Sequence, residues 1–256
     1  MMKKLSLSLS RALLLGALLI LPIAASAQDD KKAQAEREWY AACNPETDKQ
    51  KCYDLSKALL ANFPDTTYAK YAKAKVDAKD INDVWVPFKA AVDAFYAGQD
   101  GPKLEKLYST GDAFLQRSPG YSWAIAQQAL AGNSLLLQEI YKDRGKVKSY
   151  IQKGMDHFAS PNTPDAKLMD QAQWTNFRET IMATGYEVYA FDALESNPAT
   201  ALDFINKGIQ IKSTNPANAN LGWKNPNFYL FRTQINNAQY VKLSNQYTAM
   251  SNEDKV

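Results

Sequence analysis

Histidine is nearly absent from the sequence, with His157 the only one in 256 residues. A Ser-His-Asp or Cys-His catalytic triad would have to use this residue, and no nucleophile-elbow sequence accompanies it. A zinc site made of several histidines is excluded, and no P-loop or dinucleotide-binding glycine motif occurs. We therefore expect a chain that is not an enzyme and that holds no cofactor and no metal. His157 precedes Phe158 and is predicted to be an exposed residue at a helix end.

Long apolar runs are also absent, apart from ten residues near the start, Ala12–Leu21. A membrane-spanning helix needs about 20 apolar residues, so this run is too short to serve as one. Basic residues precede the run, and the small residues Ala25-Ser26-Ala27 follow it. This layout is typical of a secretory signal peptide. We expect residues 1–27 to be removed on export and the remaining chain to be periplasmic or extracellular, without a membrane span.

Removal of residues 1–27 would leave a chain with no net charge. The full chain has 30 Lys and Arg and 27 Asp and Glu, and residues 1–27 hold three of the basic residues and no acidic one. The remaining 229 residues therefore carry 27 charges of each sign. Nucleic-acid binding depends on clustered Lys and Arg, so a neutral chain predicts no nucleic-acid partner. The basic stretch Lys142–Lys148 is interrupted by Asp143 and is interpreted as a solvated helix start.

Cysteine is limited to Cys43 and Cys52. In an oxidising compartment two nearby cysteines usually pair, and their spacing does not match the two-residue separation of thioredoxin-like motifs. A turn at Asn44–Asp48 separates two predicted helices, so the bridge would join them at their connection. Closing a loop of about ten residues contributes about 2.7 kcal/mol in the chain-entropy model.

Glycine and proline number only 11 each, and alternating strand patterns are absent. Apolar residues recur at three- and four-residue spacing, which predicts an all-α fold.

Pro87 is expected to break or kink its helix. The acidic stretch Asp77–Asp83 is interpreted as a helix junction because it lacks the glycine and glutamate of a calcium loop. The polar final helix would cap the array, residues 28–250 would form one domain and residues 251–256 a disordered tail. The expected helices are Asp30–Ala42 with Lys49–Asn62, Tyr68–Gly98 with Leu104–Arg117, Tyr121–Tyr141 with Lys146–Phe158, Asp170–Leu194 with Pro198–Lys212, and Asn227–Thr248.

Four segments share one pattern of apolar and small residues. The shared small residue is Ala58, Gly111, Gly154 or Gly208. Three positions earlier stand Leu55, Tyr108, Ile151 and Ile205, and seven positions earlier Lys51, Leu104, Val147 and Ala201. Six to eight positions later stands Pro64, Pro119, Pro161 or Pro216. Each segment is therefore predicted to be an amphipathic helix whose small residue lets a neighbouring helix approach closely, followed by a turn.

The segment around Ala201, Ile205 and Gly208 resembles the second helix of a tetratricopeptide repeat, and Lys51–Pro64 fits about as well. The resemblance to secreted bacterial tetratricopeptide-like proteins covers about residues 30–250. It implies a helical-hairpin array, or α-solenoid, of about four helix pairs plus a capping helix, and a protein–protein interaction function. The small residues are 53, 43 and 54 positions apart, whereas the family repeats about every 34 residues.

Aromatic residues are plentiful, with 5 Trp and 14 Tyr. Core packing explains many of them, because the first helices of a solenoid pack on both sides. Trp223 lies in a Gly/Pro-containing segment, Leu221–Pro226, and could hold a peptide or a sugar. Trp123, Tyr121 and Trp85 are further candidate binding residues.

Three functions follow from these observations. The first is a non-catalytic binding or scaffold protein of the cell envelope with a protein or peptide partner. The second is a carbohydrate- or small-molecule-binding protein, which would place its Tyr and Trp side chains on one exposed face. The third is an envelope enzyme with two convergent Asp or Glu residues in a deep cleft.

We expect the exported protein to begin at Gln28, because signal peptidase cleaves after small residues such as Ala27. Intact mass and N-terminal sequencing of protein recovered from the periplasm or the medium would measure this. A secreted protein that retains Met1 would contradict it, and Ala27→Tyr serves as a control that should block processing.

Overall fold

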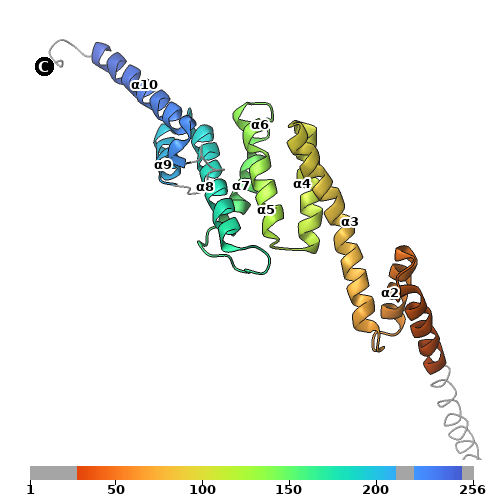
Figure 1. Cartoon of the computed structure of the whole chain (residues 1–256). Coiled ribbons are helices and arrows are strands. Elements are labelled where there is room, and N and C mark those ends of the chain that lie inside the picture. The colour runs from red at the N-terminus through yellow and green to blue at the C-terminus, as the bar shows by residue number, and fades with distance from the viewer. Residues whose placement is uncertain (1–27, 212–221, 250–256) are drawn as a thin grey trace, which may run out of the picture. The chain divides into compact units, whose positions relative to one another are not determined.

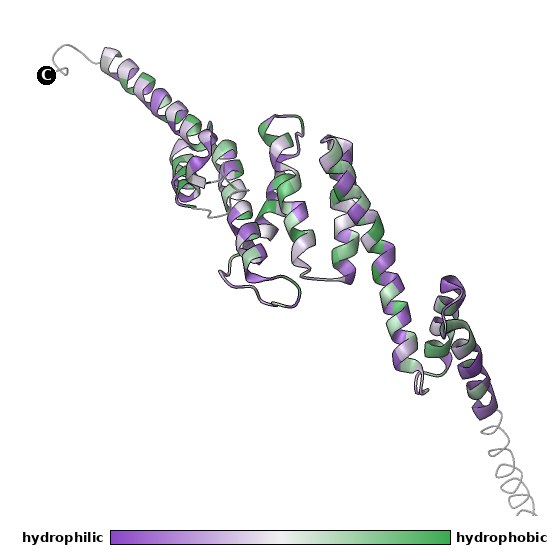
Figure 2. Cartoon of the chain, viewed as in Figure 1, coloured by the Kyte–Doolittle hydropathy of each residue, from purple (hydrophilic) through white to green (hydrophobic). Residues whose placement is uncertain are grey.

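The computed structural model describes residues 28–211 and 222–249, and within these ranges the chain is all-helical with no strand (Figure 1). Contacts divide the chain into two compact units, residues 1–83 and 84–256. The expected positions of Lys212, Pro216 and the tail 251–256 lie outside the described residues. No helix of the described part is long and apolar enough to cross a membrane, and Figure 2 shows hydrophilic residues interleaved with hydrophobic ones along the helices.

The first unit is a small helical cluster held by a disulfide. A helix over residues 28–43 and α2 (Lys49–Asn62) are joined by the Cys43–Cys52 bridge, whose Cα atoms lie 5.2 Å apart. Trp39 and Leu59 are buried between the elements, and the indole nitrogen of Trp39 donates to the Ser56 hydroxyl at 2.7 Å. The predicted cysteine pairing is therefore confirmed in the structure.

Helix α3 (Ala69–Ala97) runs through both features that were expected to interrupt it. Pro87 lies inside the helix and does not break it. The stretch Asp77–Asp83 is continuous helix, so its interpretation as a helix junction was wrong. Its carboxylates are held within the first unit instead: Lys73 pairs with Asp77 at 2.6 Å and Lys79 with Asp83 at 2.8 Å, each across one helical turn.

The second unit is a succession of packed helices. Helix α5 packs against α4 and α7, α7 against α8, α8 against α9, and α9 against α10. Phe88 and Phe95 of α3 share one core cluster with Leu104 and Leu107 of α4. The elements are α4 (Gly101–Arg117), α5 (Ser122–Ala131), α6 (Asn133–Leu137), α7 (Arg144–His157), α8 (Gln171–Ala193), α9 (Pro198–Ile209), the 3-10 turn η2 (Gly222–Lys224) and α10 (Pro226–Ala249).

Most of these helices begin at a capping side chain. In each case the side-chain oxygen accepts a hydrogen bond from the backbone N–H three residues later, which satisfies a donor that the helix itself cannot. The capping residues are Asp48, Asp100, Asp143, Asp170 and Asn197. The cap at Asp143 explains why α7 begins inside the basic stretch, as the sequence predicted.

The single helix predicted over residues 121–141 is wrong. Helix α5 ends at Ala131, and α6 is a separate turn-length helix that follows Gly132. A Cβ at Gly132 would overlap the Tyr108 hydroxyl and lie 2.8 Å from a methyl of Val147. Glycine is needed there for this close approach, and its low helix propensity favours the interruption.

The predicted role of the shared small residue holds in three of its four positions. Gly111, Gly154 and Gly208 are all buried, each against a side chain of a neighbouring helix. A Cβ at Gly154 would lie 2.5 Å from the Cβ of Ala129 and 3.2 Å from Ile181, and one at Gly208 would overlap the ring of Phe228. The absent Cβ therefore sets how closely α7 approaches α5 and α8, and α9 approaches α10.

The fourth position, Ala58, does not match. Its side chain is exposed on α2, as is Lys51, while Ser56 and Leu59 face the interior. The Ser56 hydroxyl accepts a hydrogen bond from the indole nitrogen of Trp39 in this buried region. The sequence alignment therefore placed the buried face of α2 wrongly.

Helix α10 packs along its first half only. Phe228, Phe231 and Ile235 are buried in one cluster with Ala201 and Ile205 of α9. Beyond Ile235 the described side chains are exposed. The packed part of the final helix is therefore confined to residues 226–235, and its role as the cap of an array stays a prediction.

We expect Gly154→Ala to destabilise the fold by about 1–3 kcal/mol, since overpacking a close helix contact forces the backbones apart. Gly145→Ala in the same helix is the matched control, because its Cβ would meet only an Asp143 oxygen at 3.6 Å. That variant should be neutral or slightly stabilising, because alanine has the higher helix propensity. Urea unfolding of both variants and the parent measures the difference, and equal stabilities of the two variants would contradict the close-approach argument.

Candidate functional site

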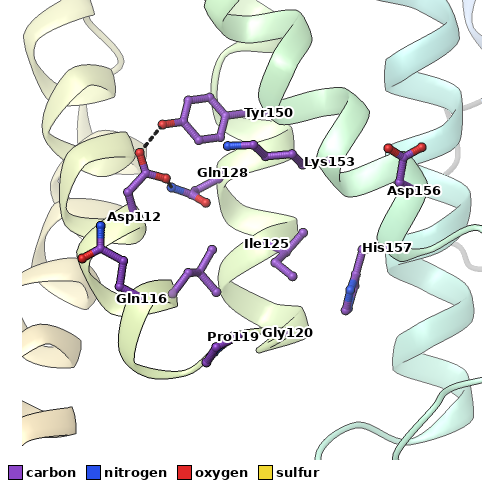
Figure 3. A pocket seen from close by; sticks show the side chains of 11 residues that line it. Asp112, Gln116, Pro119, Gly120, Ile125, Gln128, Tyr150, Lys153, Asp156 and His157 are labelled. Atoms are coloured by element: carbon purple, nitrogen blue, oxygen red, sulfur yellow. Dashed lines mark hydrogen bonds between the residues drawn. The ribbon is translucent and has the colours of Figure 1, made fainter.

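A surface groove of about 680 Å³ lies in the second unit between α4, the α4–α5 turn, α5 and α7 (Figure 3). This volume is within the range of small-ligand sites, roughly 300–1,000 Å³. The groove has an apolar wall with a few convergent polar groups, as binding sites usually do. It is lined by Asp112, Leu115, Gln116, Pro119, Gly120, Ile125, Gln128, Tyr150, Lys153, Asp156 and His157.

A fixed carboxylate stands at one end of the groove. Asp112 of α4 accepts from the Tyr150 hydroxyl at 2.6 Å on one oxygen and from the Gln128 amide at 3.0 Å on the other (Figure 3). The same Gln128 nitrogen donates to the Tyr108 carbonyl at 3.0 Å. Both partners of this nitrogen are acceptors only, so the NH₂ group must face them. Gly111 makes room for this amide, since a Cβ there would lie 2.6 Å from the Gln128 nitrogen.

The tyrosine that donates to this carboxylate is stacked on a second tyrosine. The rings of Tyr108 and Tyr150 are stacked with centroids 3.9 Å apart. Burial, reinforced by the hydrogen bond to Asp112, raises the pKa of Tyr150 far above its usual value, so its hydroxyl keeps the proton that it donates. Lys153 extends along the outer side, with its ammonium 4.7 Å from the Tyr150 ring centroid.

His157 lies toward the opposite end of the groove, and its expected exposure was wrong. It is the last residue of α7, as predicted, but it is half-buried, and its Nε2 shares a 2.9 Å hydrogen bond with the hydroxyl of Ser122. Burial lowers the pKa of His157 below its usual 6.5. Ser122 itself is buried and does not line the groove. Among the described residues no carboxylate is bonded to the other ring nitrogen, so the pair lacks the third member of a triad.

Two carboxylates, Asp112 and Asp156, line the groove. Asp156 is exposed on α7 and accepts from Gln152 one turn earlier at 2.7 Å. Figure 3 shows its carboxylate turned away from Asp112, with Lys153 between them. The two groups therefore do not converge on one point, as the acid and base of a hydrolase must.

Three of the four predicted binding residues meet in the second unit. Trp85 lies 5.3 Å from Trp123 and 5.8 Å from Tyr121, measured between ring centroids. All three are partly buried and pack on the buried rings of Phe88 and Phe114. They form an aromatic cluster, and none of the three lines the groove.

Trp223, the fourth of these residues, belongs to η2, and its side chain is outside the described residues.

The groove residues themselves were not identified from the sequence. Asp112 and Lys153 each adjoin one of the shared glycines, Gly111 and Gly154. Their neighbours on the groove come from different helices, so no local motif connects them. What the sequence does show is the position of these two residues. Each is a charged residue next to a close-contact glycine, so it lies at the edge of the contact between two helices.

A second hollow, of about 640 Å³, lies in the first unit. Both of its carboxylates are already paired within the protein, Glu46 with Lys75 at 2.5 Å and Asp83 with Lys79 at 2.8 Å. No group of three or more His, Cys, Asp or Glu residues in the described part of the chain is placed to hold a metal ion. The groove of the second unit is therefore the stronger candidate.

We expect His157 to make the protein less stable in mild acid. Its folded-state pKa is below the unfolded value, so the unfolded chain binds more protons as pH falls through about 6.5, and the free energy of unfolding decreases. Urea unfolding at about pH 7.5 and about pH 5.5 should show a smaller loss for His157→Asn than for the parent. Ser122→Ala keeps the buried imidazole and should retain the loss. An identical pH dependence of parent and His157→Asn would overturn this.

No protein-family model matches the chain, and no curated protein or solved structure is detectably similar to it.

Proposed function

We propose that this chain is a non-catalytic binding protein of the cell envelope, and that the groove between α4, α5 and α7 holds part of a polypeptide partner. The observation that carries the proposal is the groove itself, with its apolar wall, the fixed Asp112 and Lys153 on the Tyr150 ring beside it. In this proposal the successive helices form a tetratricopeptide-like hairpin array, an architecture that presents such grooves to extended segments. The disulfide supports export, since such bonds persist in oxidising compartments.

The chemistry of the groove favours binding over catalysis. The oxygens of Asp112 are each engaged by a donor that packing holds in place, which suits recognition of a complementary group. His157, the only histidine, is tied to a hydroxyl that does not reach the groove lining. A role in proton transfer would require a base that lies within hydrogen-bond reach of the substrate and that a second residue orients.

A second candidate function is binding of a saccharide or other small molecule. It is supported by the meeting of Trp85, Tyr121 and Trp123 in one partly exposed cluster. Aromatic faces bind apolar sugar and ligand surfaces. A saccharide panel that raises the melting temperature, with the rise lost in Trp123→Ala and retained in a groove variant, would favour this candidate.

We expect a photo-crosslinking amino acid to capture the partner when it replaces an exposed groove residue, Gln116 or Lys153. Matched positions outside the groove are Lys106 on α4 and Ser149 on α7, both exposed. Crosslinking is done in cells that express the full chain, and products are identified by mass spectrometry.

A shared partner at Gln116 and Lys153, with little at Lys106 and Ser149, supports the proposal. A partner captured equally at all four positions, or only at the control positions, overturns the assignment to this groove. A Gln116→Trp variant, which fills the groove from its rim, should reduce recovery of the same partner without changing the fold by circular dichroism.

A further inference from the structure

An amide oxygen faces the groove without a donor from the described residues. Gln128 is 3% exposed, and its NH₂ group is fully used by the Tyr108 carbonyl and by Asp112. Its side-chain carbonyl accepts from no described residue, and Gln128 lines the groove. In Figure 3 this oxygen points away from Asp112 toward the groove. Because it faces the groove, this oxygen is open to a donor from a bound guest.

The carboxylate beside it offers further acceptor capacity. Each Asp112 oxygen takes one hydrogen bond, from Tyr150 or Gln128, and an ionised carboxylate has about four acceptor positions. The Gln128 carbonyl and the Asp112 oxygens thus form a cluster of acceptors held by packing on α4, α5 and α7. A complementary group must present several N–H donors close together and carry positive charge.

We propose that this end of the groove binds the guanidinium of an arginine side chain of the polypeptide partner. This rests on the proposed function and names the partner's recognition element. A guanidinium is planar and presents five donors, which matches a carboxylate together with an adjacent carbonyl better than the three donors of an ammonium. The apolar wall formed by Leu115, Pro119 and Ile125 accommodates the rest of an extended segment.

Lys153 competes for the same acceptors. Its ammonium lies on the Tyr150 ring, and Figure 3 shows it extending from α7 toward Asp112 and Gln128. No ion pair within the described residues holds it there. Asp156 stands one turn further along the same helix, so Lys153 can turn toward it when a guanidinium arrives. Of the charged groups on the groove, Asp112 and Asp156 outnumber Lys153, which favours a cationic guest over an anionic one.

The probe is N-acetyl-arginine methylamide, titrated into the mature chain, residues 28–256, and followed by backbone amide shifts. The neutral isostere N-acetyl-citrulline methylamide is the matched ligand, because it keeps the shape and loses the charge. We expect saturable shifts in α4, α5 and α7, with citrulline binding about tenfold more weakly or worse.

Variants give effects of opposite sign. Asp112→Asn should weaken arginine binding by about tenfold or more, whereas Lys153→Gln should tighten it roughly two- to fivefold by removing the competing charge. Lys153 is exposed, so the second variant keeps the proposal testable even if Asn at 112 disturbs the fold. Asp93→Asn and Lys106→Gln, both exposed and outside the groove, should leave binding unchanged.

Equal affinity for arginine and citrulline, or weaker arginine binding by Lys153→Gln, would overturn the guanidinium assignment. So would tighter binding of N-acetyl-glutamate, lost in Lys153→Gln, because the groove would then be an anion site. If crosslinks persist at Gln116 and Lys153 while arginine selectivity is absent, this inference fails and the proposed function stands. If arginine selectivity is present while no polypeptide crosslinks there, the site binds the cation and the proposed function fails.

Discussion

The close approach of helices at glycine is the constraint on which the second unit depends. At Gly111, Gly154 and Gly208 a single Cβ would overlap or crowd a side chain of the adjacent helix. Interiors pack at crystal-like density, so one methyl at such a contact is not absorbed without moving a helix. The same contact creates the site. Because Gly111 has no side chain, Gln128 can reach the α4 backbone and hold Asp112 from within the seam. The structural glycine and the candidate binding residue are neighbours because one makes the other possible.

Much of the fold follows from local sequence signals. Helix α2 occupies the predicted residues, and α8 and α10 start and end within one residue of theirs, because capping residues such as Asp48 and Asp170 mark where helices begin. The disulfide follows from the spacing of Cys43 and Cys52 around a turn. Where local signals conflicted with packing, packing prevailed. Pro87 did not interrupt α3, and the helix expected to continue through residue 132 stopped because two neighbours approach the Gly132 backbone.

The groove could not be predicted for a different physical reason. Its polar groups come from three helices and are separated by up to 45 positions, as between Asp112 and His157. Only packing brings them together, and no alignment of local patterns contains that information. His157 illustrates the difference. Its place at the end of α7 was predictable, whereas its burial and its bond to Ser122 depend on how α5 lies against α7. The aromatic candidates were chosen individually, and the structure brings them together through contacts of the Trp85 ring with those of Tyr121 and Trp123.

The Gln128 amide is held in one orientation at the candidate binding site. The Gln128 side chain is mostly buried, but its carbonyl oxygen faces the groove and is open to a donor from outside. The orientation of this amide cannot reverse, since both groups around its nitrogen are acceptors. An occupant that donates to its carbonyl therefore gains an interaction for which the protein has already fixed the geometry. Preorganisation of this kind reduces the ordering entropy of binding, which is how a shallow groove can be selective without a large buried area.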